Sequence, residues 1–236
     1  MSPLLELAQV SKRGVQGRRE RVLLDRVCMR VQAGELAVVL SANHHESRAL
    51  LRIAAGLEAP DSGVVRFDGR DLARAGEELR GVQVGYVQRS LRGSEGRSVL
   101  SLTAAALLAH GLTPSRANEA AHVALERVGA ESCARLPASD LGEEERVRVA
   151  LARTLALAPR LVVVDEPIKG VTPLQRDELL RLLRKLSSEG VAVLVGTADP
   201  AGLTGADRAF SLDGGRLAAS SEPQLAAVLQ LRRATG

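Results

Sequence analysis

Two short stretches of the sequence combine side-chain types that could do chemistry. In the first, His44-His45-Glu46, imidazole and carboxylate groups of the kind that bind zinc stand together. Adjacent residues of an extended segment point to opposite faces, and no third ligand follows at a metal-binding spacing, so a solvated loop is favoured. The second, Asp165-Glu166, ends an apolar run and by itself indicates two solvated carboxylates at the end of a strand.

The composition argues against a metal site made of cysteines and against a nucleic-acid-binding function. Cys28 and Cys133 are far apart and in no metal-binding spacing, which predicts two reduced thiols in a cytosolic protein. The formal net charge of +4 comes from 32 basic and 28 acidic side chains, interspersed along the 236 residues. Phe67, Tyr86 and Phe210 are too few to build the stacking surfaces that bind single-stranded nucleic acids. We therefore expect no nucleic-acid partner.

The sequence predicts no segment that enters a membrane. Residues 1–6 lack the basic head and apolar run of a signal peptide. The most apolar region, 147–164, carries Arg148, Arg153 and Arg160, which makes it unsuited to crossing a bilayer. Any role at a membrane must therefore go through a partner.

The elements that must position these residues alternate between strands and helices. Residues 173–188 predict a helix, with Thr172 and Gln175 at the spacing of a capping box and Gly190 at its end. Such alternation implies a mostly parallel sheet covered on both faces. In chain order we expect strands 4–10, 22–31 and 35–40, helix 47–57, strands 64–67 and 82–87, helices 99–112, 114–128 and 143–158, strand 161–164, helix 173–188, and strands 191–195 and 208–212.

This order of elements resembles the nucleotide-binding domain of ATP-binding-cassette (ABC) transporters. Residues 35–57 are similar to that family's strand, phosphate loop and helix, and residues 61–72 to its following hairpin. Residues 148–167 are similar to its signature helix running into the strand that ends on Asp165-Glu166. The strand Val84-Gly85-Tyr86-Val87 and Glu145 look most like the lipoprotein-release and macrolide-export branch.

The resemblance implies a fold and a domain organisation. The expected fold is an α/β cassette of the P-loop NTPase type, whose mostly parallel sheet has helices on both faces. An antiparallel β region at the N-terminus and an inserted helical lobe complete it. We expect a single domain over residues 1–236, with the α/β core at about 1–90 and 150–236 and the lobe at about 92–148.

The resemblance also implies a Mg-ATP site, but this sequence departs from its pattern at the phosphate loop. The family pattern G-x-x-x-x-G-K-[ST] falls on residues 41–48, where Ser41 and Glu46 replace the two glycines. Ser47 replaces the lysine and Arg48 the hydroxyl residue that meets magnesium. We expect strain of about 1 kcal/mol for each lost glycine, and about 3–4 kcal/mol of repulsion from Glu46 facing a phosphate.

The other motif positions depart in the same direction. The family's signature, L-S-G-G-[QE], reads Leu141-Gly142-Glu143-Glu144-Glu145, which predicts a well-capped helix start that repels an anion. The remaining departures are Gly14 for the adenine-stacking aromatic, Arg89 for a glutamine, Thr172 for an aspartate and Ala198 for a histidine. Asp165 and Glu166 alone keep their types, and resemble the family's magnesium-organising aspartate and general base.

These residues favour a binding or regulatory subunit over a catalyst. We expect a cassette-like subunit with Mg-ATP binding that is weak or absent, with Asp165 organising magnesium only if nucleotide binds and Glu166 idle as a base. Its partners would be a membrane permease, docked on the helical lobe, and another cassette in a homo- or heterodimer. It would lie in the cytoplasm at the inner face of the membrane. The alternative is an active ATPase subunit that energises export through the permease, or a cassette without a permease.

Overall fold

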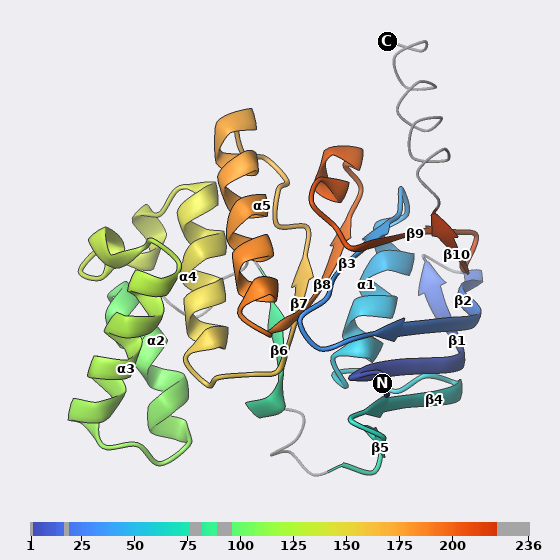
Figure 1. The fold of residues 1–236 in the computed structure, drawn as a ribbon, viewed down its shortest axis with the longest axis horizontal. Coiled ribbons are helices and arrows are strands. Elements are labelled where there is room, and N and C mark those ends of the chain that lie inside the picture. The colour runs from blue at the N-terminus through green and yellow to red at the C-terminus, as the bar shows by residue number, and fades with distance from the viewer. Residues whose placement is uncertain (1, 17–18, 76–81, 89–95, 221–236) are drawn as a thin grey trace.

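Two sheets form the framework of the computed structural model, which describes residues 2–16, 19–75, 82–88 and 96–220 (Figure 1). The smaller sheet is antiparallel and has the strand order β2-β1-β4-β5. Its first two strands pair antiparallel, as expected for the N-terminal region, and are longer than the predicted strands 4–10 and 22–31; the turn 68–69 joins its last two. Its strands are β1 (Leu5–Gln16), β2 (Arg19–Val31), β4 (Ser62–Phe67) and β5 (Arg70–Asp71).

The larger sheet has the order β10-β9-β3-β8-β7-β6 and is parallel from β9 to β6. Parallel pairing places the carboxyl ends of these strands at one edge, which is where ligands bind in open α/β sheets. Strand β10, which the sequence did not predict, pairs antiparallel with β9. The strands are β3 (Leu36–Leu40), β6 (Val84–Val87), β7 (Leu161–Asp165), β8 (Ala192–Thr197), β9 (Arg208–Asp213) and β10 (Arg216–Ser220).

Alternating side chains of the central strands build a core on each face of the larger sheet. In β7, Val162 and Val164 face the core that contains α4 and α5, whereas Leu161 and Val163 face the core that contains α1 and the small sheet. Because both faces are covered, β7 is buried at every position. The predicted cassette architecture, a mostly parallel sheet with helices on both faces beside an antiparallel region, is confirmed.

Five α-helices cover the described sheets, and three of them group beside β6 (Figure 1). Helices α2, α3 and α4 pack against one another, and a small core including Ala104, Leu107, Ala117 and Ala121 lies between α2 and α3. The helices are α1 (His44–Ala54), α2 (Val99–Ala109), α3 (Pro114–Arg127), α4 (Glu143–Leu155) and α5 (Pro173–Ser188). Within the described ranges, none is long and apolar enough to cross a membrane.

The starts of α5 and α1 differ in how well the sequence predicted them. The capping box of Thr172 and Gln175 starts α5, as predicted. Helix α1 instead begins three residues earlier than predicted, at His44, so the expected loop His44-His45-Glu46 is its first turn. The reason is Asn43, which caps the helix by accepting a hydrogen bond from the amide of His45.

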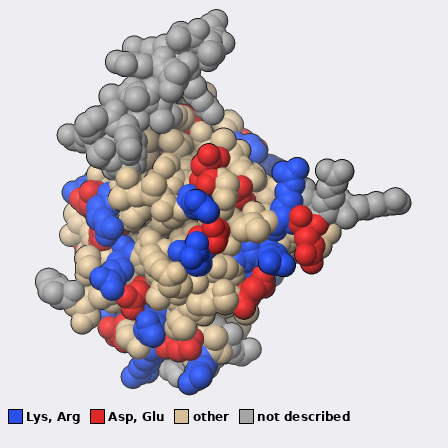
Figure 2. Space-filling view, turned by 90° about the vertical axis from the view of Figure 1, so that its right-hand side faces the viewer, with Lys and Arg blue, Asp and Glu red and all other residues tan. Residues whose placement is uncertain are grey.

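The surface on the β1–β2 side mixes both signs of charge. Figure 2 shows basic and acidic side chains next to one another over this face rather than in one patch of a single sign. Ion pairs involving these strands follow the same pattern, for example Arg30 with Glu6 at 2.9 Å and Arg216 of β10 with Asp25 at 3.3 Å. Basic and acidic side chains are therefore interspersed on this face.

Candidate functional site

The candidate site lies at the edge where β3, β7 and β8 end. Helix α1 follows β3 after a three-residue loop, and Asp165 is the last residue of β7. Helix α1 packs closely on β8: a Cβ added to Gly196 of β8 would lie only 2.7 Å from Oγ of Ser47 in α1. The fold therefore brings residues 41–48 to the same edge as the Asp165–Glu166 pair.

The backbone of the loop avoids the strain that the sequence suggested. None of residues 41–48 has a positive φ angle, so no position there needs a glycine. Ser41 Oγ instead accepts a hydrogen bond from the amide of Asn43 at 3.3 Å, and the Asn43 side chain caps α1. The expected cost of replacing the glycines is therefore absent, since these residues keep ordinary dihedral angles.

Glu46, which the sequence placed facing a phosphate, is instead bonded inside the protein. Its side chain is buried, and Oε1 accepts a hydrogen bond of 2.7 Å from Asn43 Nδ2. Oε2 accepts one of 3.1 Å from the amide of Gly215, in the turn between β9 and β10. The Gly215 carbonyl in turn accepts from the amide of Asp25 in β2. Glu46 thus connects the start of α1 to both sheets.

Position 47, where the family pattern has a lysine, is fully buried. Ser47 has no exposed surface, and its Oγ finds no hydrogen-bond partner in the described part of the chain. The next residue, Arg48, is half-buried and is one of the positive charges that act on Tyr86. A long side chain at position 47 would have to displace α1 from β8.

Asp165 is held by a tyrosine. Tyr86 in β6 donates its hydroxyl to Asp165 Oδ2 at 3.1 Å. Burial raises the pKa of Tyr86, and the Asp165 charge raises it further, so this hydroxyl stays protonated. The other carboxylate oxygen, Oδ1, is buried without a hydrogen-bond partner among the described residues.

Glu166 lies in a strained position beside Asp165. Its φ is +50°, a left-handed conformation that is uncommon for residues other than glycine. Oε1 accepts a hydrogen bond of 3.0 Å from the amide of Ala198. Burial raises the pKa of Glu166, and the neighbouring charge of Asp165 adds to the rise despite that hydrogen bond. The carboxyl therefore holds its proton more tightly than a solvated glutamate.

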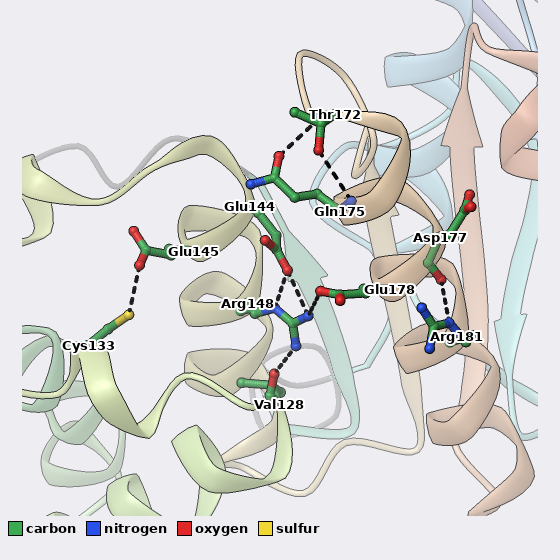
Figure 3. Close-up of polar contacts among 10 residues, drawn as sticks. All are labelled: Val128, Cys133, Glu144, Glu145, Arg148, Thr172, Gln175, Asp177, Glu178 and Arg181. Carbon is green, nitrogen blue, oxygen red and sulfur yellow. Dashed lines mark hydrogen bonds and ion pairs between the residues drawn. The ribbon is translucent and has the colours of Figure 1, made fainter.

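The start of α4 uses its carboxylates internally (Figure 3). Glu145 accepts a hydrogen bond of 2.7 Å from the amide of Gly142 and contacts Cys133 Sγ at 3.5 Å. Glu144 pairs with Arg148 at 2.7 Å. The predicted well-capped helix start is present. The expectation that this helix start repels an anion stays a prediction; Glu144 and Glu145 are bound within the protein, and Glu143 is exposed.

Arg148 is the centre of this cluster. Besides Glu144, its guanidinium donates to the carbonyl of Val128 at the end of α3 and to Glu178 of α5 (Figure 3). The arginine is mostly buried, with 16% of its side chain exposed. It therefore joins the group of helices beside β6 to the helix that covers the larger sheet.

The other motif positions have structural partners. Leu23 fills the space beside Gly14, since a Cβ there would lie 2.5 Å from Leu23 Cδ1. Thr172 caps α5, and Ala198 contributes only its amide, to Glu166. Arg89 lies outside the described residues. In the described parts of the chain, no three His, Cys, Asp or Glu side chains group as a metal site.

Sequence reasoning missed Tyr86, Arg148 and Gly215 as parts of this region. Tyr86 and Asp165 are 79 residues apart, and Gly215 and Glu46 are 169 apart. No spacing in the sequence links such pairs. The Asn43–Glu46 pair is different, because an Asn-x-x-Glu spacing resembles a capping box and could have located the start of α1.

Comparison with known proteins gives one consistent result. A profile of the family described as "ABC transporter" matches residues 24–169. The lipoprotein-releasing system ATP-binding protein LolD of Anaplasma marginale is 32% identical over 225 residues, which cover 92% of this chain and 99% of that protein. The sulfate/thiosulfate import ATP-binding protein CysA 2 of Chromobacterium violaceum is also 32% identical, over 85% of this chain and 54% of that protein.

Solved structures agree on the fold. The ATP-binding cassette MJ0796, in a dimeric post-hydrolysis state with ADP and Pi, superposes with a TM-score of 0.82 at 21% identity, covering 92% of this chain and 98% of that one. A nucleotide-free ATP-binding cassette from an ABC transporter gives a TM-score of 0.83 at 19% identity, covering 97% and 95%. The resemblance inferred from the sequence, including that to the lipoprotein-release branch, is confirmed.

Proposed function

The chain belongs to the ABC transporter family as an ATP-binding-type subunit, and from this premise we propose that it is a non-hydrolysing interaction or regulatory subunit. The catalytic contribution of an active cassette depends on bound Mg-ATP. The proposal is that this chain has replaced the contacts to nucleotide with contacts to itself. Its role would then be to bind partner proteins, and not to hydrolyse ATP.

One observation carries the proposal: the carboxylate of Glu46 occupies the start of α1. A helix start attracts phosphate through its amides and dipole, but here Asn43 already accepts from the first turn. Glu46 adds a buried negative charge within that turn, bound to Gly215. Mg-ATP does not fit these residues, since Ser47 offers no cation and the carboxylate opposes phosphate.

The partners in the proposal follow the family. We infer one domain over residues 1–236 whose helical lobe, about 92–148, docks a membrane permease and so holds the chain in the cytoplasm at the inner face of the membrane. A second cassette, of the same or another kind, would complete a dimer. The Arg148 contact to Glu178 supports this role, because it joins the lobe to a helix of the core, while the contacts to Glu144 and Val128 lie within the lobe.

A working ATPase is the second candidate. It is favoured by the Asp165–Glu166 pair at the end of β7 and by the buried Oδ1 of Asp165, which has no hydrogen-bond partner among the described residues and which a cation could contact. It requires the Glu46 contacts to open, with loss of the hydrogen bonds to Asn43 and Gly215.

Titrating the purified chain with labelled ATP and magnesium separates the two candidates. We expect a dissociation constant weaker than about 1 mM, where a filled site would bind in the micromolar range. The melting temperature should not move on adding about 1 mM Mg-ATP, because only a ligand of the native state stabilises it. A shift of several degrees, with hydrolysis above background, would establish the ATPase instead.

A further inference from the structure

A cavity of about 230 Å³ lies away from the site just described. It is enclosed by the end of α1 and the loop after it, by β4, and by the turn that follows β5. At about 30 Å³ for one water molecule, this volume corresponds to roughly eight waters, so it suits a molecule smaller than the ligands of typical pockets. Its lining includes Ile53, Leu57, Glu58, Val65, Asp71 and Leu72.

The inner wall of the cavity is apolar. Ile53 of α1, Val65 of β4 and Leu72 belong to the core that contains α1 and the small sheet, and each is at most 4% exposed. An alkyl chain placed on this wall leaves water, and each methylene group that it buries strengthens binding by up to about fourfold. The wall therefore favours a ligand with an apolar chain.

Asp71 places a carboxylate at the rim of the cavity. Its Oδ1 accepts a hydrogen bond of 2.9 Å from the amide of Ala73, which also lines the cavity, so the carboxylate is held beside the opening. Its Oδ2 forms an ion pair of 3.8 Å with Arg74, whose side chain is 90% exposed. Such a surface pair contributes little to stability, so a cation of a ligand can replace Arg74 at this oxygen.

Glu58, the other charged side chain of the lining, already has its own partners. Its Oε1 lies 3.4 Å from Lys12 Nζ, and its Oε2 lies 3.1 Å from Arg52 Nε. Both charged residues of the lining are acidic, and neither Lys12 nor Arg52 lines the cavity. The charge that remains for a ligand is therefore the carboxylate of Asp71, and the complementary group is a cation.

The rim favours a free molecule over a segment of a partner protein. The side chains of Glu58, Asp71 and Arg74 are all partly or fully exposed around it, whereas charged residues are depleted at the centre of protein interfaces. A small ligand needs only an apolar wall and one well-placed polar group. A primary ammonium group is a compact charge that pairs with a single carboxylate, and it stays protonated near pH 7.

We propose that this cavity binds a small primary amine, whose ammonium group pairs with Asp71 while its alkyl chain lies on Ile53, Val65 and Leu72. The inference goes beyond the proposed function and does not depend on it, because the cavity shares no residue with loop 41–48 or with the Asp165–Glu166 pair. The bound amine would connect the end of α1 to the small sheet.

The experiment uses the two isoleucines of the chain, Ile53 and Ile168, as reporters. Ile53 lines the cavity, whereas Ile168 follows β7 and does not. The full chain with labelled isoleucine methyl groups is titrated with pentylamine at about pH 7 and followed by NMR. We expect a saturable shift of the Ile53 signal at about millimolar concentration, with the Ile168 signal unchanged.

Two further probes separate the charge from the chain. Pentan-1-ol keeps the alkyl chain but has no charge, and should bind at least about tenfold more weakly than pentylamine. Methylamine keeps the charge but lacks four methylene groups, and should also bind at least about tenfold more weakly.

Three variants assign the charge to Asp71. Asp71→Asn keeps the acceptor for the Ala73 amide and should remove the preference for pentylamine over pentan-1-ol. Asp71→Glu keeps the charge and should retain part of the preference. Asp213→Asn is the control, because Asp213 is an exposed residue of β9 outside the cavity, and it should behave as the natural chain does. An unchanged Ile168 signal in each variant reports that the fold is intact.

Several results would overturn the proposal. These are equal binding of pentylamine and pentan-1-ol, no shift of Ile53, equal shifts of Ile53 and Ile168, or a preference for the amine that survives in Asp71→Asn. Tighter binding of acetyl-Ala-Lys-Ala-amide than of pentylamine would show a site for a protein segment and not for a free amine. The outcome is separable from the proposed function, since the Mg-ATP titration and the amine titration probe different residues and either can fail alone.

Discussion

Glu46 Oε2 accepts a hydrogen bond of 3.1 Å from the amide of Gly215, 169 residues further along the chain. This contact brings a carboxylate from the first turn of α1 to the turn between β9 and β10. Both oxygens of the carboxylate are bonded, and the residue is 5% exposed. The residue at a glycine position of the family pattern therefore links α1 to the β9–β10 turn. The first prediction tests how much this link contributes to stability.

Glu46→Ala should lower the free energy of unfolding by about 1.5–3 kcal/mol. The reason is that it removes two hydrogen bonds to a charged group and leaves the Gly215 amide unsatisfied. Urea denaturation measures the change. Glu143→Ala is the matched control, because Glu143 lies on the exposed start of α4 and its removal should change stability by less than about 0.5 kcal/mol. Equal effects of the two changes would show that the Gly215 contact contributes nothing.

Ser47→Lys alone should not restore nucleotide binding. Position 47 has no exposed surface, and its Oγ lies against Gly196, so a lysine must displace α1 while Glu46 stays in place. Replacing residues 41–48 by a loop of the pattern G-x-x-x-x-G-K-[ST] should give measurable binding of labelled ATP, since it removes Glu46 and adds the cation. Tight binding by the single change with none by the graft would contradict the placement of this loop.

Mixing this chain with an intact partner cassette should leave ATPase activity flat or lower it. The resemblance implies that each nucleotide lies between one chain's phosphate loop and the other's signature, and this chain has substituted both. Glu166→Gln in this chain should change the rate no further. Phosphate release measured at several mixing ratios tests this, and stimulation that Glu166→Gln abolishes would refute the non-hydrolysing role.

The stability of Glu166→Gln relative to the natural chain should depend on pH. The folded state raises the pKa of Glu166 above its ordinary 4.5, chiefly through burial, so the folded chain binds this proton more tightly than the unfolded chain. The contribution of Glu166 to the free energy of unfolding is therefore fully present below about pH 4.5. It is lost as the pH rises from that value through the raised pKa of the folded state. Glutamine removes this loss, and Glu166→Gln should melt at a higher temperature than the natural chain at about pH 7.

Melting curves at several pH values measure that difference. It should shrink toward zero near about pH 4, where both the folded and unfolded chains carry a protonated Glu166. Glu143→Gln, at an exposed position, should show no such trend. A difference that is independent of pH would mean that hydrogen bonding or backbone strain at position 166, and not ionisation, decides the effect.

Arg148→Ala should destabilise the fold by about 2–4 kcal/mol, because it leaves the Val128 carbonyl and the Glu144 carboxylate without their donor. Arg181→Ala on α5 is the control, since Arg181 donates to the Asp177 carbonyl within its own helix and is exposed (Figure 3). Its effect should stay within about 0.5 kcal/mol. Equal losses of stability in the two variants would show that the contacts of Arg148 between α4 and α5 do not stabilise the fold.

The sequence by itself determined the family and most of the elements. Thr172 and Gln175 set the start of α5 because a capping box closes within three residues. The alternation of strands and helices predicted the parallel sheet, and that sheet places Asp165 at the edge where β3 ends. Both inferences need only the residues that are near one another in the chain.

Only the tertiary structure decided what the replaced motif residues do. The sequence predicted that Glu46 faces a phosphate and that Glu144 and Glu145 help to repel an anion. In the fold they bind Gly215, Arg148 and the Gly142 amide. The partners of Glu46 and Asp165 come from segments 169 and 79 residues away, whose approach depends on strand order. A buried carboxylate accepts hydrogen bonds from whichever donors the fold brings near it. The spacing of residues in the sequence does not show which distant donors these are.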